Sequence, residues 1–391
     1  MTVVATTDLH GTHASVGARM VQLDALRAFA VFAVMLLHFW PENFFVEHFP
    51  VGATGLYLFF VLSGFLITGI LDRGRTSQRS RFIPEFYLRR ALRLLPLYYA
   101  VVVFLLFFSP DAQQHWPCYA VQIMNVCITA QSQWGPAGHF WSLAAEEQFY
   151  LLWPFAVLFL DRRSLIATCW ALIFLAPIYR EIALLVTHEP YAGTLLPGAM
   201  DLLAAGSLLA LQPAAFPARV TLPIGLAGVV VTILVYDNGD LAAIADEALG
   251  PTLLLPIFCW LVGGASEGFG GALGRTLSNP ALRYIGRISY CMYVIHFPLI
   301  RAPAVIRHLL VHVPGGAQAM QHLLLRMGPG AHLLLRFAAL SGVTIAIAAF
   351  SWRFYEGPIN RLRHRVSLAR WFGGGVTPIE ALGVSTGEPR R

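Results

Sequence analysis

Lysine is absent from the 391-residue chain, and all 27 basic residues are arginine. Charged residues of both signs make up only 12% of the chain, about half the share that is usual in a soluble domain. Hydrophobic residues make up 57%, and the mean hydropathy is +0.63. This composition excludes a soluble globular protein, and no nucleic-acid partner is expected. It predicts an integral membrane protein that contacts lipid along most of its length.

Cysteine is also scarce, and the five cysteines form no C-x-x-C pair. Neither a zinc site nor a redox motif is therefore indicated. Cys118 and Cys127 share one loop that we place outside the membrane, where an oxidising compartment could join them; two unpaired thiols fit the sequence equally well. His308 and His312 form an H-x-x-x-H pair without an evident third ligand, so no metal site is expected.

Ten apolar segments are candidates to cross a hydrocarbon layer of about 30 Å. The sequence thus predicts an all-α, polytopic bundle of about ten transmembrane helices over residues 21–360, with a tail at 1–20 and a basic tail at 361–391. The predicted spans are residues 23–40, 52–71, 94–108, 143–160, 165–186, 195–211, 222–236, 252–264, 285–300 and 332–354.

Arginine clusters set the predicted orientation, because retained positive charge marks the cytoplasmic side of a membrane protein. The segment after the second span is the most basic, so we place it inside. With ten spans, both termini are then cytoplasmic. The arginines of that segment are Arg73, Arg75, Arg79, Arg81, Arg89, Arg90 and Arg93.

The first span carries three ionisable residues, Asp24, Arg27 and His38, in an otherwise apolar helix. Such residues are costly inside a membrane and usually have a partner or a task. Eleven residues bring Arg27 and His38 to nearly the same helix face, about 16 Å apart along the axis. We predict that both line one cavity, Arg27 near its inner end and His38 near its outer end. In the alternative, Asp24 merely pairs with Arg27 and His38 caps the helix.

The fourth span places Ser142, Glu146 and Tyr150 on one helix face, at its predicted outer end. Glu146 is therefore expected at the depth of His38, where a carboxylate could orient an imidazole that acts as a general base. Alternatively, Glu146 faces water in the headgroup layer, as we expect for Glu147.

Two further patterns carry polar groups at or within the spans. Arg90 and Arg93 lie close together on the helix that enters the third span, where guanidinium groups attract either anionic lipid or ligand phosphates; composition alone favours lipid. In the ninth span, Ser289, Tyr293 and His296 form a polar stripe that faces protein. Structural hydrogen bonds between helices explain that stripe equally well.

Taken together, these segments resemble acyltransferase family 3 of membrane proteins over about residues 23–361. Six elements carry the resemblance in order: LDALR with an R-x10-H spacing, LFFVLSGFLIT, FYLRRALRLLP, WSLAAEEQFY, ISYCMYVIH and RFYEGP. The chain departs from the family at Tyr57, where an acidic residue is common, and at Ala25 and Ala28, where glycines are common.

The resemblance implies a multi-pass enzyme of the bacterial inner membrane that moves an acyl group, by default acetyl, from acyl-CoA to a hydroxyl of a glycan, lipid-linked sugar or glycosylated metabolite. Acyl-CoA is a co-substrate, no cofactor is bound permanently, and the partners are the sugar or glycolipid acceptor and membrane lipid. The implied roles are catalysis for His38 and Glu146, donor binding for Arg27, Arg90 and Arg93, and support from Asp24, Ser142, Tyr150, Tyr293 and His296.

In the predicted mechanism, His38 takes the proton of the acceptor hydroxyl as it attacks the thioester; an acyl-histidine intermediate is the competing route. The acceptor would be recognised in loops through residues such as Trp116, Trp134 and His139, which specify no particular sugar. Two other classes fit a polar cavity in a membrane bundle: a transporter or flippase, which moves its substrate without consuming acyl-CoA, and a scaffold or sensor, which would tolerate loss of His38.

Overall fold

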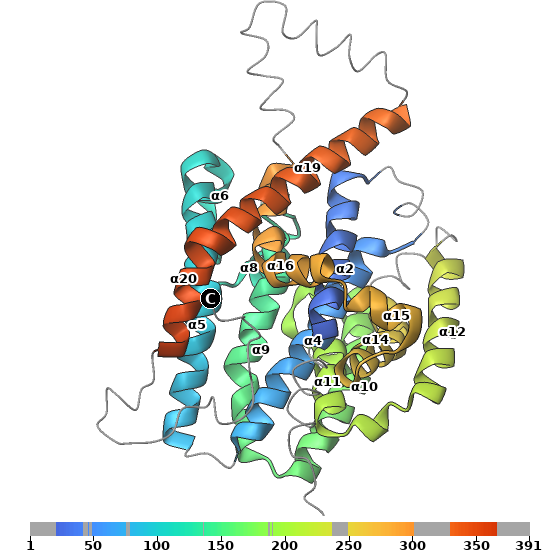
Figure 1. Cartoon of the computed structure of the whole chain (residues 1–391). Coiled ribbons are helices and arrows are strands. Elements are labelled where there is room, and N and C mark those ends of the chain that lie inside the picture. Colours follow the sequence, from blue (N-terminus) through green and yellow to red (C-terminus); the bar gives the residue numbers. More distant parts are fainter. Residues whose placement is uncertain are drawn as a thin grey trace, which may run out of the picture.

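The computed structural model describes residues 21–41, 46, 49–75, 79–135, 137–186, 188–189, 191–236, 249–300 and 329–365. Within these ranges the regular secondary structure is helical, without a strand, which confirms the all-α prediction (Figure 1). Residues 1–20 and 366–391 lie outside the described ranges. The cytoplasmic termini and the limits of the two tails therefore stay predictions.

Each of the ten predicted spans overlaps one helix of the described chain. These helices are α2 (Val21–Phe39), α4 (Val51–Gly74), α5 (Arg79–Phe108), α9 (Phe140–Phe159), α10 (Arg162–Val186), α11 (Leu196–Leu211), α12 (Ala218–Tyr236), α14 (Gly250–Glu267), α16 (Pro280–Leu299) and α19 (Pro329–Ser351).

The predicted number of ten transmembrane helices is not confirmed by length and apolarity. In the described chain, six helical stretches are long and apolar enough to cross a membrane, containing α2, α4, α5, α10, α12 and α19. The pair of α14 and the short α15 (Gly271–Leu277), bent by 80°, makes a seventh if it is one span. Of the remaining helices, α11 has only 16 residues, while α9 and α16 carry polar side chains of the candidate site.

Helix α2 packs between α4 and α16, and glycines permit both close approaches. Gly52 and Gly55 of α4 lie against successively earlier parts of α2, Leu37 and then Ala30, so the two helices run antiparallel. Gly286 of α16 lies against the backbone of Asp24, where a Cβ atom would collide with the Asp24 carbonyl group. This packing fixes the α2 face that carries Arg27 and His38.

Helix α4 is also crossed closely by α11. Gly64 and Gly206 meet the backbone of the opposite helix, and a Cβ on either would collide with it. Beside this crossing, the Thr68 hydroxyl donates a hydrogen bond to Ser207 Oγ at 2.8 Å and accepts one from Trp153 Nε1 of α9 at 2.8 Å. Small residues and inter-helix hydrogen bonds of this kind hold helices together inside a membrane.

The long helix α5 lies at one edge of the bundle, where α20 (Gly357–Arg365) runs beside it (Figure 1). A π-helical turn, Trp352–Glu356, joins α19 to α20, and its Tyr355 hydroxyl donates to the Pro96 carbonyl group of α5 at 3.0 Å. Three short helices, α6 (Pro110–Gln114), α7 (Trp116–Ala120) and α8 (Met124–Gln131), follow α5. A disulfide joins Cys118 to Cys127 there, which decides between the two alternatives that the sequence left open.

Candidate active site

Two adjoining cavities lie between the helices, and Leu56 and Tyr293 line both. The smaller cavity, of about 90 Å³, contains four arginines: Arg27, Arg90, Arg93 and Arg287. The larger, of about 570 Å³, contains His38 near the end of α2. Arg27 and His38 therefore line two neighbouring cavities rather than the single cavity that the sequence had predicted.

The imidazole of His38 is held through its Nδ1 atom. This atom lies 2.9 Å from the Val34 carbonyl oxygen and 3.3 Å from His296 Nε2, while His296 Nδ1 lies 2.6 Å from the Tyr293 carbonyl oxygen. A carbonyl oxygen only accepts hydrogen bonds, so each histidine carries its hydrogen on Nδ1. The His38 Nδ1–H group then faces two acceptors, Val34 and His296, and the lone pair of His38 lies on Nε2. This is the arrangement that a general base requires.

A third histidine, His139, lies beside this pair. Its ring centroid is 4.9 Å from that of His296, and its ring stacks on Phe297 at 4.9 Å. Its carbonyl oxygen accepts a hydrogen bond from the Tyr293 hydroxyl at 3.0 Å. From the sequence, His139 was interpreted only as a loop residue. Its position three residues before Ser142, close to one helical turn, could have indicated that it lies near the site.

Ser142 and Tyr293, both predicted as supporting residues, are in direct contact. Their hydroxyl groups lie 2.6 Å apart, and this bond joins α9 to α16. Tyr293 also belongs to the wall between the two cavities. The polar stripe of the ninth predicted span therefore faces protein, as expected, and it makes structural hydrogen bonds at the border of the site.

Glu146 lies in the arginine-lined cavity. Its Oε1 atom accepts a hydrogen bond from the Ser63 hydroxyl at 2.7 Å, and Ser63 accepts one from the Tyr150 hydroxyl at 2.9 Å. The Arg90 guanidinium group lies over the Tyr150 ring, 3.7 Å from its centroid, and both Arg27 and Arg90 are close enough to attract the carboxylate. Glu146 thus helps to arrange guanidinium groups.

The predicted contact between Glu146 and His38 is wrong. Among the described residues no hydrogen bond joins them, because Glu146 is bonded to Ser63 and His38 to Val34 and His296. Helix α4 gives the reason: Gly52 lies beside Leu37, whereas Ser63 lies eleven residues further along, a rise of about 16 Å. Glu146 is deeper in the bundle than His38, near the level of Arg27.

The arginines of the smaller cavity differ in how they are held. Arg27 Nη1 pairs with Asp24 Oδ1 at 3.2 Å, as the alternative interpretation of the first span had it, and it lines the cavity as well. Arg90 makes no hydrogen bond to any described residue, and its Nε atom is buried. Arg287 joins them from α16, and the candidate site predicted from the sequence did not include it.

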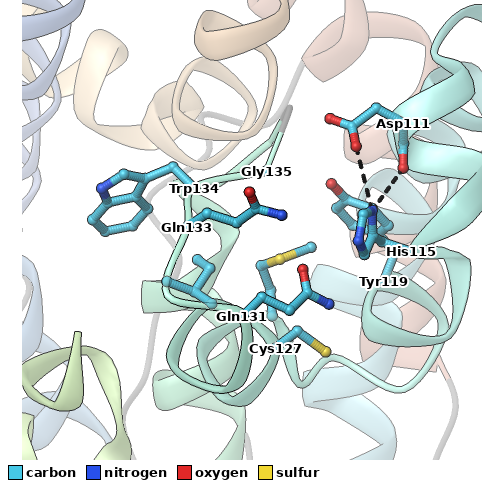
Figure 2. A pocket seen from close by; sticks show the side chains of 10 residues that line it. Asp111, His115, Tyr119, Cys127, Gln131, Gln133, Trp134 and Gly135 are labelled. Carbon is cyan, nitrogen blue, oxygen red and sulfur yellow. Dashed lines mark hydrogen bonds and ion pairs between the residues drawn. The ribbon is translucent and has the colours of Figure 1, made fainter. Parts of the chain in front are cut away.

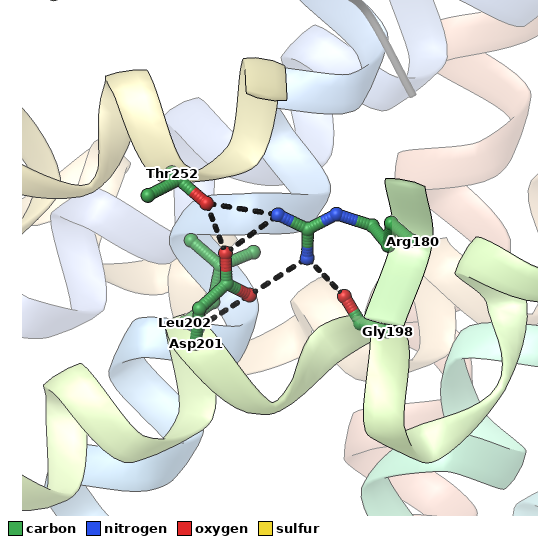
Figure 3. A network of polar contacts seen from close by, with 5 residues as sticks. All are labelled: Arg180, Gly198, Asp201, Leu202 and Thr252. Atoms are coloured by element: carbon green, nitrogen blue, oxygen red, sulfur yellow. Dashed lines mark hydrogen bonds and ion pairs between the residues drawn. The ribbon is translucent and has the colours of Figure 1, made fainter. Parts of the chain in front are cut away.

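A buried ion pair forms part of the wall of the larger cavity, between α10, α11 and α14 (Figure 3). Arg180 Nη2 lies 2.9 Å from Asp201 Oδ2, and the two side chains are only 3% and 0% exposed. Thr252 of α14 accepts from Arg180 and donates to Asp201, and Arg180 also donates to the Gly198 carbonyl group. This pair was not predicted from the sequence, since its two members lie on different helices and match no motif.

Metal ligation has no support in the described part of the chain, where no group of three or more His, Cys, Asp or Glu side chains is arranged around a common point. His308 and His312, the sequence pair considered above, lie outside the described residues.

A known protein family matches most of the chain. The family model of an acyltransferase domain matches residues 20–353, most of the chain. The chain belongs to acyltransferase family 3. Membership in acyltransferase family 3 confirms the resemblance on which the sequence analysis relied, and it places the two cavities within the conserved domain of that family.

Three relatives illustrate the match. The peptidoglycan O-acetyltransferase OatA of Listeria monocytogenes is 28% identical over 87% of this chain and 55% of its own length. The O-acetyltransferase OatA of Staphylococcus aureus is 27% identical over 71% and 50%. The putative peptidoglycan O-acetyltransferase YrhL of Bacillus subtilis is 26% identical over 86% and 54%. The chain spans about half the length of these relatives, and no solved structure matches it.

Proposed function

We propose that this chain is an O-acyltransferase of the bacterial inner membrane, which transfers an acyl group from acyl-CoA to a hydroxyl of a glycan. Acetyl is the expected group, because the named relatives are O-acetyltransferases. The observation that carries the proposal is the pair of adjoining cavities, one lined by four arginines and the other by His38, with Leu56 and Tyr293 between them.

The smaller cavity is the proposed site of the donor. Coenzyme A carries phosphate groups, and guanidinium groups bind phosphate through charge-assisted, often paired hydrogen bonds. Arg90 has free capacity for this, since it makes no hydrogen bond to any described residue. Glu146, held by Ser63, attracts the neighbouring guanidinium groups of Arg27 and Arg90. The thioester end of the donor would extend past Leu56 and Tyr293 toward His38.

His38 is the proposed general base. Its Nε2 lone pair takes the proton of the acceptor hydroxyl as that oxygen attacks the thioester carbonyl carbon. The C–S bond then breaks, and the thiolate takes the proton from His38 Nε2, so the histidine returns to its first state. During this step the His38 imidazolium donates through Nδ1–H to Val34 and His296. A positioned base of this kind contributes about 10²- to 10⁴-fold to a rate.

The disulfide supports the proposed orientation. Cys118 and Cys127 pair in the segment that follows α5, and disulfides persist in oxidising compartments. That segment is therefore placed on the outer side, and the arginine-rich segment at the start of α5 on the cytoplasmic side, where acyl-CoA is available. The end of α2 that carries His38 then points outward, toward a glycan acceptor.

The proposal is tested with the purified chain in lipid nanodiscs, supplied with acetyl-CoA and a sugar acceptor. Release of the CoA thiol and the mass of the acceptor report the two halves of the reaction. Wild-type protein is expected to acetylate the sugar, and His38→Ala to abolish transfer while inserting at a normal level. His188→Asn is the matched control, because His188 is exposed, lines neither cavity and has the positive φ of 52° that asparagine tolerates.

Full transfer by the His38→Ala protein would remove the assigned role of His38. In sealed proteoliposomes, passage of the sugar across the membrane without any release of CoA thiol would instead identify the chain as a transporter or flippase. An acyl group found on His38 in trapped protein would replace direct transfer by the acyl-histidine route.

A further inference from the structure

A third pocket opens beside the larger cavity, in the segment that carries the disulfide. Its volume is about 80 Å³, and Figure 2 shows its polar side chains gathered on one side and Trp134 on the other. Its polar lining residues are Asp111 and His115 at α6 and Gln131 and Gln133 at the end of α8. None of these residues belongs to the two cavities described above.

Trp134 connects this outer pocket to the catalytic cavity, because it lines both. Its side chain is 52% exposed, and its ring meets the edge of the Tyr191 ring at a centroid distance of 5.4 Å. Tyr191 also lines the cavity of His38. A ligand that begins at His38 can therefore continue along Trp134 and end between the two glutamines.

The side chains along this path suit a sugar chain. Trp134, Trp141 and Tyr191 present flat apolar rings with one polar tip each, which match the apolar face and the hydroxyl edge of a pyranose. Gln131 and Gln133 are exposed, and their side-chain amides bond to no described residue, so each amide can both donate to and accept from hydroxyl groups. The Asp111 carboxylate, 3.4 Å from His115 Nδ1, adds an acceptor.

The pocket is held in shape before any ligand binds. The disulfide between Cys118 and Cys127 ties α7 to α8, directly beneath the pocket. Between the two glutamines, Ser132 takes a left-handed conformation with φ of 49°, and its hydroxyl donates to Glu189 at 3.2 Å. A pocket ordered in advance loses less conformational entropy when it binds a flexible ligand.

We propose that the outer pocket is a second sugar subsite, so that the acceptor is a chain of at least two linked sugars rather than a monosaccharide or a small metabolite. The reacting sugar lies on the aromatic side chains near His38, and the next sugar crosses Trp134 and places its hydroxyl or amide groups between Gln131 and Gln133. This inference rests on the proposed acyl transfer to a glycan.

The experiment compares acceptors of increasing length, using β-1,4-linked N-acetylglucosamine oligomers of one to four units as probes. For the wild-type protein, kcat/KM is expected to rise by roughly tenfold from the monomer to the longer oligomers, as two to three new hydrogen bonds would give. The double variant Gln131→Ala/Gln133→Ala should lose this rise and keep the rate with the monomer. The control is Gln114→Ala, because Gln114 is an exposed residue of α6 that lines none of the three pockets described above.

A binding measurement separates this inference from the proposed function. Titration of the inactive His38→Ala protein with the same oligomers, followed by tryptophan fluorescence, should show tighter binding of the longer oligomers and its loss in the Gln131→Ala/Gln133→Ala background. Equal affinity for one and four units, or a length preference that survives the double substitution, overturns the second subsite even if transfer is observed. Length-dependent binding without transfer to any oligomer overturns the proposed function and leaves the subsite in place.

Discussion

His296 Nε2 lies 3.3 Å from His38 Nδ1, and Phe297 packs against the same His38 ring. With its own hydrogen on Nδ1, His296 accepts from His38 and stabilises the imidazolium that forms in the reaction. We predict that His296→Ala lowers kcat by about 10- to 100-fold and leaves the KM for acyl-CoA nearly unchanged, since a hydrogen bond to a charged group contributes about 1.5 to 3 kcal/mol.

Steady-state kinetics at varied acyl-CoA concentrations measure kcat and KM separately. Met292→Leu, a volume-conserving change at a buried position of the same helix, should leave kcat and KM within about twofold of the wild-type values. A rise in KM with unchanged kcat would mean that His296 serves donor binding and not the imidazole.

Arg90→Ala should raise the KM for acyl-CoA by roughly tenfold, because one charge-assisted contact to phosphate is lost. Arg90→Lys should recover only part of the affinity, since an ammonium group cannot lie flat on the Tyr150 ring or bond in a fork. The increase in KM of each variant over the wild-type protein should become smaller at high salt. The control is Arg219→Ala, because Arg219 is exposed and lines neither cavity. An unchanged KM for acyl-CoA in the Arg90→Ala protein would reject the smaller cavity as the donor site.

Asp201→Leu should destabilise the protein by about 3 to 5 kcal/mol, because it leaves the Arg180 guanidinium buried without its carboxylate. Adding Arg180→Met should restore part of this loss. Thermal unfolding in detergent measures both, and Arg163→Ala, an exposed arginine of the same helix, should change little. If the double variant is less stable than Asp201→Leu alone, Arg180 and Asp201 do not stabilise the protein as the ion pair that Figure 3 shows.

Cys118→Ser frees the Cys127 thiol in the segment that we place outside. A membrane-impermeant maleimide applied to intact spheroplasts should label this variant and not the wild-type protein, whose remaining cysteines, Cys169, Cys259 and Cys291, are buried. Loss of the cross-link should also cost about 2 to 3 kcal/mol of stability. Labelling that requires permeabilised cells would reverse the proposed orientation.

Helical periodicity predicted a large part of the site from the sequence. The spacing of Arg27 and His38 placed both on the inner face of α2, and the spacing within α16 placed Tyr293 and His296 toward protein. These predictions depend on one helix at a time, and the geometry of a single helix is nearly constant.

The contacts between helices could not be predicted in this way. Glu146 was placed beside His38 because both were assigned to outer helix ends, yet the crossing of α4 and α9 brings it to Ser63. His139 and the pair of Arg180 and Asp201 depend on how three helices meet, which no local pattern specifies.

The pairing of Arg180 with Asp201 also bears on how the chain enters the membrane. A lone arginine or aspartate in a membrane helix costs up to about 2.5 to 3.5 kcal/mol on insertion scales, the full cost applying at the helix centre. Because α10 and α11 follow each other directly in the chain, each can neutralise the charge of the other while both leave the translocon. The two helices should therefore be integrated together as a hairpin, and a chain cut between them should leave α10 poorly inserted.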